Sequence, residues 1–102
     1  MKPLKLNEAA ESDAVEASDW YLTRAGTQVA IRFIDAIEAG LARIQADPET
    51  GFLSEHRTRS LIVIRFPYRI VFREYDEYTE VFAVAHMRRS TFWTSRLDDE
   101  RV

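Results

Sequence analysis

Hydrophobic residues between positions 28 and 46 recur at helical spacing and form the clearest pattern in the chain. Counted from the first of them, they lie at i, i+3, i+4, i+7, i+11 and i+14, which places them on one face of a helix. They are Ala30, Phe33, Ile34, Ile37, Leu41 and Ile44. The spacing predicts an amphipathic helix that covers a sheet. Asp47 and Pro48 end this helix, because the residue before a proline is disfavoured in the helical conformation.

A second helical pattern precedes this one, over residues 8–24, and its apolar face is made mostly of alanine. The apolar positions are Ala10, Ala14, Ala17 and Tyr21. Asn7 is the expected N-cap and Gly26 the expected C-cap, while Thr27 is expected to cap the start of the following helix. Only a short Ala-Gly-Thr link separates the two segments, so they are predicted to form an antiparallel helical hairpin.

Three short runs rich in apolar and β-branched residues follow the helices, and each predicts a strand. They span residues 61–66, 68–75 and 79–86. Residues 3–6 alternate in polarity and predict an edge strand, whereas residues 52–60 show little periodicity and are interpreted as a loop. The order is β-α-α-β-β-β with a short C-terminal helical or irregular tail. This order is typical of a two-layer α+β fold, in which an antiparallel helical hairpin packs on a largely antiparallel sheet.

The run at 68–75 assigns its side chains to two faces of the predicted sheet, since neighbouring residues of a strand point to opposite sides. The set expected to face the helices is Tyr68, Ile70, Phe72 and Glu74. The opposite set is Arg69, Val71, Arg73 and Tyr75. We expect the second face to be at least partly open, so that a ligand or partner could reach Arg69 and Arg73.

Composition narrows the classes of protein to consider. With 102 residues, of which 46% are hydrophobic and 30% charged, the whole chain (1–102) is expected to form a single domain. The chain has no cysteine and only two histidines, His56 and His86, so neither a metal site nor a cofactor is expected. The sequence shows no export signal and no apolar run of membrane-spanning length, and we expect a cytoplasmic protein without membrane contact.

The formal net charge of -3 is distributed unevenly along the chain. Residues 1–55 carry 5 Lys and Arg against 10 Asp and Glu, while residues 56–102 carry 9 against 7. All nine basic residues of the second half are arginines, which favour bidentate recognition of carboxylate or phosphate groups. The isoelectric point near 5.4 argues against the strong positive field of proteins that bind nucleic-acid phosphates.

Two motifs in the second half of the chain resemble the ParE/RelE superfamily of toxins from bacterial toxin-antitoxin modules. They are FPYRIVF at residues 66–72 and VFAVAH at residues 81–86, the latter followed by MRR. The helical region resembles ParE-type members more closely than RelE-type members, through WY at 20–21, AIRFIDAIEAGLARI at 30–44 and DPETG at 47–51. The resemblance covers nearly the whole chain. It implies a small cytosolic toxin in a hetero-oligomer with a cognate antitoxin, whose tail wraps over the toxin and holds it inactive.

Two activities occur in this superfamily. RelE-like members cut messenger RNA in the ribosome with basic residues and a proton-transfer group, whereas ParE-like members are associated with inhibition of DNA gyrase through protein contacts. Arg69 and Arg89 (or its neighbour Arg88), with His86 as a titratable group, match part of the RelE set. Residues 61–64 lack the RelE lysines, and the tail lacks the RelE tyrosine. We therefore expect gyrase inhibition, with a metal-independent endoribonuclease or a degenerate, antitoxin-binding module as the alternatives.

Two binding surfaces follow from this interpretation. The target is expected to contact basic and aromatic residues of the second half, namely Arg65, Arg69, Arg73, Arg88, Arg89 and Trp93. The antitoxin is expected to contact the helical hairpin at Trp20, Tyr21, Leu22 and Phe33. The first three of these are consecutive and cannot share one helical face, so at least one of them should be exposed.

A structural role is the alternative for several of these residues. Arg69 could form an ion pair with an acidic residue on a neighbouring strand, such as Glu80. His86, at the end of a predicted strand, could be a hydrogen-bonded structural histidine. Phe92 and Trp93 could pack a C-terminal turn against the sheet.

Overall fold

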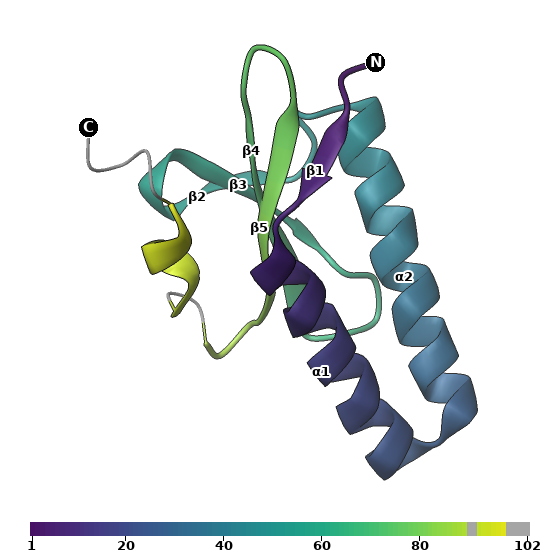
Figure 1. Cartoon of the computed structure of the whole chain (residues 1–102). Coiled ribbons are helices and arrows are strands. Elements are labelled where there is room, and N and C mark those ends of the chain that lie inside the picture. The colour runs from purple at the N-terminus through teal and green to yellow at the C-terminus, as the bar shows by residue number, and fades with distance from the viewer. Residues whose placement is uncertain (90–91, 98–102) are drawn as a thin grey trace.

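The computed structural model describes residues 1–89 and 92–97, which form a five-stranded sheet with two helices on one side (Figure 1). The elements in chain order are β1 Leu4–Leu6, α1 Glu8–Ala25, α2 Thr27–Ala46, β2 Phe52–Ser54, the 3-10 turn η1 Glu55–Arg57, β3 Thr58–Ile62, β4 Tyr68–Glu74, β5 Thr79–His86 and the 3-10 turn η2 Phe92–Arg96. Figure 1 shows η2, in yellow, on the opposite side of β5 from the helices. The predicted α+β fold is confirmed; the part of the predicted tail at 98–102 lies outside the described residues.

The strands lie side by side in the order β1-β5-β4-β3-β2. β1 pairs with β5 in parallel, with Leu4 opposite Thr79 and Leu6 opposite Val81. The other neighbouring strands pair in the antiparallel sense, so the sheet is largely antiparallel, as predicted. β5 continues to His86, well past the end of β1, and this second half of β5 has no strand beside it on the β1 side among the described residues.

The chain between the helices and β4 differs from the prediction of a loop at 52–60 and a strand at 61–66. The structure has β2 and η1 within the predicted loop, and β3 ends at Ile62. Beyond that residue the chain turns: the Val63 amide donates to the Tyr68 carbonyl at 2.9 Å. The predicted strand at 61–66 therefore begins and ends too late along the chain. The apolar residues that predicted it continue from β3 into the turn.

The sequence pattern did not predict the start of β3, because buried polar side chains occupy it. Thr58 and Ser60 are completely buried, and their hydroxyl groups form hydrogen bonds with Ser54 of β2 at 2.7 and 3.0 Å. These bonds allow polar residues to occupy inward positions that normally hold apolar side chains. The intervening turn η1 places His56 and Arg57 in the left-handed region, with φ of 58° and 60°, a conformation that sequence alone does not indicate.

The helix ends follow the predicted caps with one exception. The Asn7 side chain accepts a hydrogen bond from the Ala9 amide at 2.8 Å, which confirms Asn7 as the N-cap of α1. Gly26, with φ of 97°, is the C-cap, and its amide donates to the Leu22 carbonyl at 3.2 Å. Thr27 was predicted as the N-cap of α2, but it is the first helical residue. Gly26 caps both helices because it is the single residue between them.

The helix-facing core lies between the hairpin and the sheet. Its buried residues are Ala10, Ala17, Phe33, Ile37, Ile44, Leu61, Val63, Ile70, Phe72, Val81 and Val84. Gly40 lets α2 approach the sheet closely, since a Cβ atom there would lie 2.8 Å from Ile70 Cδ1. Of the predicted inward set of β4, Tyr68, Ile70 and Phe72 face this core, in agreement with the alternation of side chains along a strand. Glu74, the fourth member, is exposed and pairs with Lys2 at 2.6 Å.

The turn-facing core lies on the other side of the sheet, and it overturns the expectation of an open face. Its buried residues are Val71, Phe82, Ala83, Ala85, Trp93 and Leu97. A β-bulge opposite Val71 and Phe72 skips Phe82 in the register, so that Phe82 and Ala83 both face this core. Arg69 and Arg73 are only 5% and 9% exposed, because η2 and η1 cover the face on which they lie.

Candidate functional site

An open cleft of about 950 Å³ lies between α1 and the ends of β4 and β5. It is the larger of two concave sites on the described residues that we consider. Trp20 and Tyr21 of α1 line one wall, and His86, Arg88 and Arg89 line the other. The sequence assigned Trp20 and Tyr21 to an antitoxin surface, Arg88 and Arg89 to a separate target surface, and His86 only to the nuclease alternative. The structure brings them together in a single cleft.

An aromatic cluster forms the inner wall of this cleft. The Tyr21 ring lies 5.1 Å from both Phe33 and Phe66, measured between ring centroids. Trp20 packs edge-on against Tyr21 at 5.2 Å, remains 50% exposed, and carries the Arg24 guanidinium over its ring. Tyr21 therefore anchors the wall, while Trp20 presents its ring to solvent.

The four residues predicted to bind an antitoxin differ in accessibility. Trp20 and Leu22 are 50% and 48% exposed, which confirms that the consecutive residues do not share one face. Tyr21 is partly buried, and Phe33 is completely buried under the aromatic cluster. A partner cannot contact the Phe33 ring directly, because Phe33 is part of the helix-facing core that joins α2 to the sheet.

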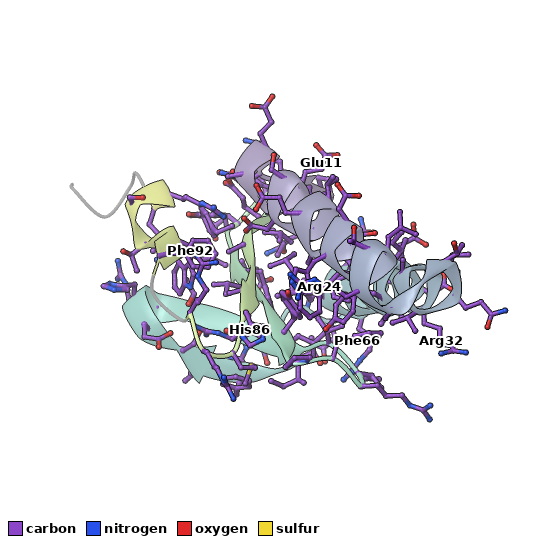
Figure 2. The ribbon with its side chains drawn as sticks, turned by 90° about the horizontal axis from the view of Figure 1, so that it is seen from below. Glu11, Arg24, Arg32, Phe66, His86 and Phe92 are labelled. Carbon is purple, nitrogen blue, oxygen red and sulfur yellow. The ribbon has the colours of Figure 1, made fainter. Side chains whose placement is uncertain are left out.

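Tyr68, His86 and Arg89 gather at the floor and C-terminal edge of the cleft. The Tyr68 and His86 rings meet edge-on at 5.1 Å. His86 Nδ1 accepts a hydrogen bond from the Arg88 amide at 3.1 Å, and its carbonyl accepts one from the Arg89 amide at 2.9 Å. Figure 2 shows His86 on the sheet, with Phe92 on the C-terminal side of it. The tight turn after β5 thus places two arginines at the cleft entrance.

Burial changes the proton affinity of two phenols in the cleft. Burial raises the pKa of Tyr68 above its ordinary value near 10, and the nearby Arg89 charge partly opposes this shift. Burial, and secondarily Tyr68, raises the pKa of Tyr21. Both phenols therefore keep their protons at neutral pH and can donate hydrogen bonds.

Arg69 lies on the opposite side of the sheet from this cleft. Its Nη1 donates to Ser60 Oγ at 2.7 Å and approaches Glu55 Oε1 at 3.4 Å, and its guanidinium lies over the Trp93 ring. The acidic partner is Glu55 rather than Glu80. Since adjacent residues of β4 point to opposite faces, Arg69 cannot join His86 and Arg89, and the predicted nuclease set is not assembled.

Arg73 and Trp93 are also buried, so they do not belong to the exposed target-binding surface that the sequence predicted. Arg73 donates to the carbonyls of His56 and Arg57 and so holds the left-handed residues of η1 in place. Trp93 is completely buried in the turn-facing core, which confirms that it packs the C-terminal turn against the sheet. Both side chains hold turns on this face of the sheet.

Three of the six arginine and tryptophan residues predicted to meet a target are exposed. Arg65 lies in the turn between β3 and β4 with φ of 74°, and Arg88 and Arg89 follow β5. The Met87 amide donates to the Pro67 carbonyl at 2.9 Å, which ties the two turns together. The exposed arginines thus share one end of the sheet, and we refer to them as the basic end.

An ion pair that no sequence signal indicated closes the upper part of the cleft. Asp13 of α1 and Arg96 of η2 meet at 2.7 and 3.2 Å through two hydrogen bonds. Arg96 also donates to the Phe82 carbonyl at 2.9 Å, and the Val84 amide donates to Asp13 at 3.1 Å. These side chains satisfy backbone groups on the edge of β5 that faces away from β4, beyond the end of β1.

A second, smaller groove of about 320 Å³ lies along the helical hairpin. Apolar residues of α1 and α2 line it, with Phe33 and Ile37 at its base and Val15 and Ile34 exposed. Its charged lining residues are Glu11, Asp19 and Glu38. We refer to it as the acidic groove.

The part of the chain that the structure describes offers neither a metal site nor a membrane-spanning helix. Within residues 1–89 and 92–97, no three His, Cys, Asp or Glu side chains are grouped so that they could hold a metal ion. Among the same residues, no helix combines the length and apolarity needed to cross a membrane. The cleft, the basic end and the acidic groove are therefore the surfaces from which we argue function.

The chain is similar to a protein family and to solved structures. A family model described as "ParE toxin of type II toxin-antitoxin system, parDE" matches residues 4–91. A comparison with curated proteins gives no match. Among solved structures, a chain from "Chromosomal ParDE TA system from P. aeruginosa" is 24% identical, covering 84% of this chain and 96% of that chain, with a TM-score of 0.76. At this identity, the second similarity shows a shared fold.

Proposed function

The chain belongs to the ParE toxin family of type II toxin-antitoxin systems, and on this basis we propose that it inhibits growth by contacting DNA gyrase. A cognate antitoxin would neutralise it in a hetero-oligomer. In this proposal, residues 1–102 act as one toxin domain in the cytoplasm, and inhibition results from protein contact rather than catalysis.

The basic end is the observation that supports a protein target most directly. Arg65, Arg88 and Arg89 are exposed on two turns that are hydrogen-bonded to each other, so their relative positions are fixed. Guanidinium groups bind carboxylates in bidentate geometry, which suits contact with an acidic protein surface. The burial of Arg69 on the other side of the sheet removes a cation that RNA cleavage would require.

A supercoiling assay tests this proposal. The purified toxin should inhibit DNA gyrase, and changing Arg88 and Arg89 to Ala together should weaken inhibition by about tenfold or more. The matched control changes Arg32 and Arg43, two exposed arginines of α2, to Ala. Loss of inhibition in the control as well, or no inhibition by the unchanged toxin at high excess, would refute a gyrase contact through the basic end.

Trp20 is the residue from which we test the antitoxin contact. Its half-exposed ring lies in the cleft on a rigid helix, and tryptophans in such positions often dominate binding energies. Trp20→Ala should weaken binding by about 2 kcal/mol, measured by calorimetry with the product of an adjacent antitoxin-like reading frame. Leu53→Ala, at an exposed position on β2, is the control. Equal binding by Trp20→Ala and the unchanged toxin would exclude the cleft as the antitoxin site.

The cleft also supports one enzymatic alternative. His86 and Tyr68 could transfer protons and Arg89 could stabilise a phosphate, so the cleft holds part of the chemistry of a metal-independent endoribonuclease. Cleavage of ribosome-bound mRNA that is lost in His86→Ala, without gyrase inhibition, would favour this alternative. Antitoxin binding without either activity would favour a degenerate module.

A further inference from the structure

The cleft between α1 and the ends of β4 and β5 has two walls of different chemistry. We propose that it binds a free nucleoside diphosphate, with the base on Trp20 and the phosphates on Arg88 and Arg89. In this arrangement Glu16 accepts hydrogen bonds from the ribose hydroxyls. The binding itself requires neither gyrase nor an antitoxin. Since Trp20 is also the proposed contact of an antitoxin, a bound nucleotide would compete with that contact.

The size of the cleft suits a small ligand that contacts both walls. Its volume of about 950 Å³ lies within the range of about 300–1,000 Å³ that is typical of small-molecule sites. Four rings form a continuous line across it, with 5.2, 6.3 and 5.1 Å between successive centroids, namely Trp20, Tyr21, Tyr68 and His86. A ligand that follows this line reaches from α1 to the end of β5.

The wall at the end of β5 provides the positive charge. The Phe92 ring carries two guanidinium groups, that of Arg89 at 5.6 Å and that of Arg96 at 5.1 Å from its centroid. Arg96 is paired with Asp13, whereas within residues 1–89 and 92–97 neither Arg88 nor Arg89 forms an ion pair. Guanidinium groups donate paired hydrogen bonds to phosphate oxygens. This wall therefore favours the phosphate end of a ligand.

The α1 wall provides groups that suit the other end of a nucleotide. Ser12, Glu16 and Trp20 are spaced four residues apart, so they lie on one face of α1, and all three line the cleft. Trp20 is 50% exposed, and an exposed indole is a stacking surface for a base. Glu16 is exposed and forms no ion pair with another described residue. Its carboxylate can accept hydrogen bonds from ribose hydroxyls.

The two walls together argue against other anionic ligands. A strongly acidic peptide would bring several carboxylates past Glu16, and like charges oppose association. An inorganic anion would leave the Trp20 ring exposed. A nucleoside diphosphate is anionic at one end and aromatic at the other, so it matches both walls. The acidic groove offers no such site, because its charged lining residues are all carboxylates.

Titration of the full-length toxin with ADP tests the proposal. Adenosine lacks the phosphates and pyrophosphate lacks the base, so each of these two fragments can contact one wall only. Calorimetry should give ADP an affinity about tenfold or more above that of either fragment. Stacking of the base should also quench Trp20 fluorescence. ADP should cause no quenching in Trp20→Phe, because the remaining Trp93 is completely buried on the other side of the sheet.

Substitutions assign the two ends of the ligand to the two walls. Arg88→Ala combined with Arg89→Ala should lower the affinity for ADP by about tenfold and leave the affinity for adenosine unchanged. Trp20→Ala should lower both affinities by about tenfold. The matched control combines Arg32→Ala with Arg43→Ala, which removes the same charge from exposed positions of α2. This control should keep the affinity for ADP of the unchanged toxin.

Several results would overturn the proposal. Equal affinity for ADP and pyrophosphate, equal losses in the two double arginine variants, or unchanged Trp20 fluorescence would each do so. A single-stranded RNA of about six nucleotides that binds about tenfold more tightly than ADP would establish an RNA strand as the occupant instead. The titrations contain neither gyrase nor an antitoxin, so the proposed function can succeed where this inference fails, and the reverse.

Discussion

One face of the sheet lies under two helices of 18 and 20 residues, whereas the other lies under two 3-10 turns, η1 of three residues and η2 of five. The helices bring long apolar stripes, so the helix-facing core is a continuous cluster of apolar side chains. The five-residue turn brings only Trp93 as a large apolar group, with Leu97 following it. On that face, Arg69 and Arg73 fill much of the remaining space with their stems.

Charge alone suggested that these arginines are all exposed, but the structure divides them into a buried group and an exposed group. Arg69 and Arg73 are buried and bind groups of this chain, where they position η1 and the turn-facing core. Arg88 and Arg89, at the end of β5, remain exposed. Among the described residues, the exposed arginines of the predicted target set accordingly lie at the end of the sheet and not on a sheet face.

The largest effect on this comparison should come from Phe33→Ala. It removes a completely buried ring from the helix-facing core and should lower the free energy of unfolding by about 3–5 kcal/mol. Urea denaturation measures this change. Leu53→Ala, 75% exposed on β2, should change stability by less than about 0.5 kcal/mol. Similar stability of the two variants would show that the hairpin does not hold this face.

Arg69→Ala tests whether the second face depends on its buried arginine. The substitution leaves Ser60 Oγ without its 2.7 Å donor and removes the side chain over Trp93, so unfolding should require about 1–3 kcal/mol less. Trp93 fluorescence, isolated in a Trp20→Phe background, should shift to longer wavelength. Arg88→Ala should show neither change. Unchanged stability with lost toxicity in Arg69→Ala would instead indicate direct contact with the target.

Asp13→Asn should have a smaller effect, confined to the border between the two faces. The change removes one charge of the Asp13 and Arg96 pair, whose side chains are 13% and 20% exposed, and should lower stability by about 1 kcal/mol. Amide hydrogen exchange should accelerate at Val84 and in η2. Asp35→Asn, at an exposed position of α2, serves as the control. Unaltered exchange at Val84 would show that the pair does not protect β5.

The smallest effect should appear only at alkaline pH. Burial raises the pKa of Tyr21 and of Tyr68 in the native state, so the native state binds these protons more tightly than the unfolded state. The resulting stabilisation is complete below about pH 10 and is lost as the pH rises through the raised native values. Urea midpoints should fall in that range, and Tyr21→Phe with Tyr68→Phe should reduce the decline. The control is Tyr78→Phe, and an equal reduction there would contradict this assignment.

The sequence predicted the helix-facing side well and the other side poorly, for physical reasons. Helical periodicity in α2 and alternation in β4 reflect one-sided apolar burial, and this is the information that a local pattern contains. Arg69 is covered by Trp93, which lies farther along the chain than the short stretch over which a periodic pattern can be recognised. The left-handed backbone falls on His56 and Arg57, and neither position holds a glycine, the residue that signals this conformation most strongly.

The candidate site divides in the same way. The exposure of Trp20 followed from helical geometry, because consecutive residues point in different directions. The Asp13 and Arg96 pair could not be predicted, since its partners belong to opposite ends of the chain and neither lies in a recognisable motif. The meeting of Trp20 with Arg88 and Arg89 in one cleft likewise depends on how α1 lies against β5.

The parallel pairing of β1 with β5 has a consequence for the timing of synthesis. β1 cannot pair with β5 until Val81, the partner of Leu6, has been synthesised. Roughly 70 residues are translated between the two strands, which takes several seconds at about 5–20 residues per second. The hairpin of α1 and α2, whose contacts are local, can form during this interval, whereas the sheet cannot be completed. Both helices that line the acidic groove are thus synthesised before the basic end.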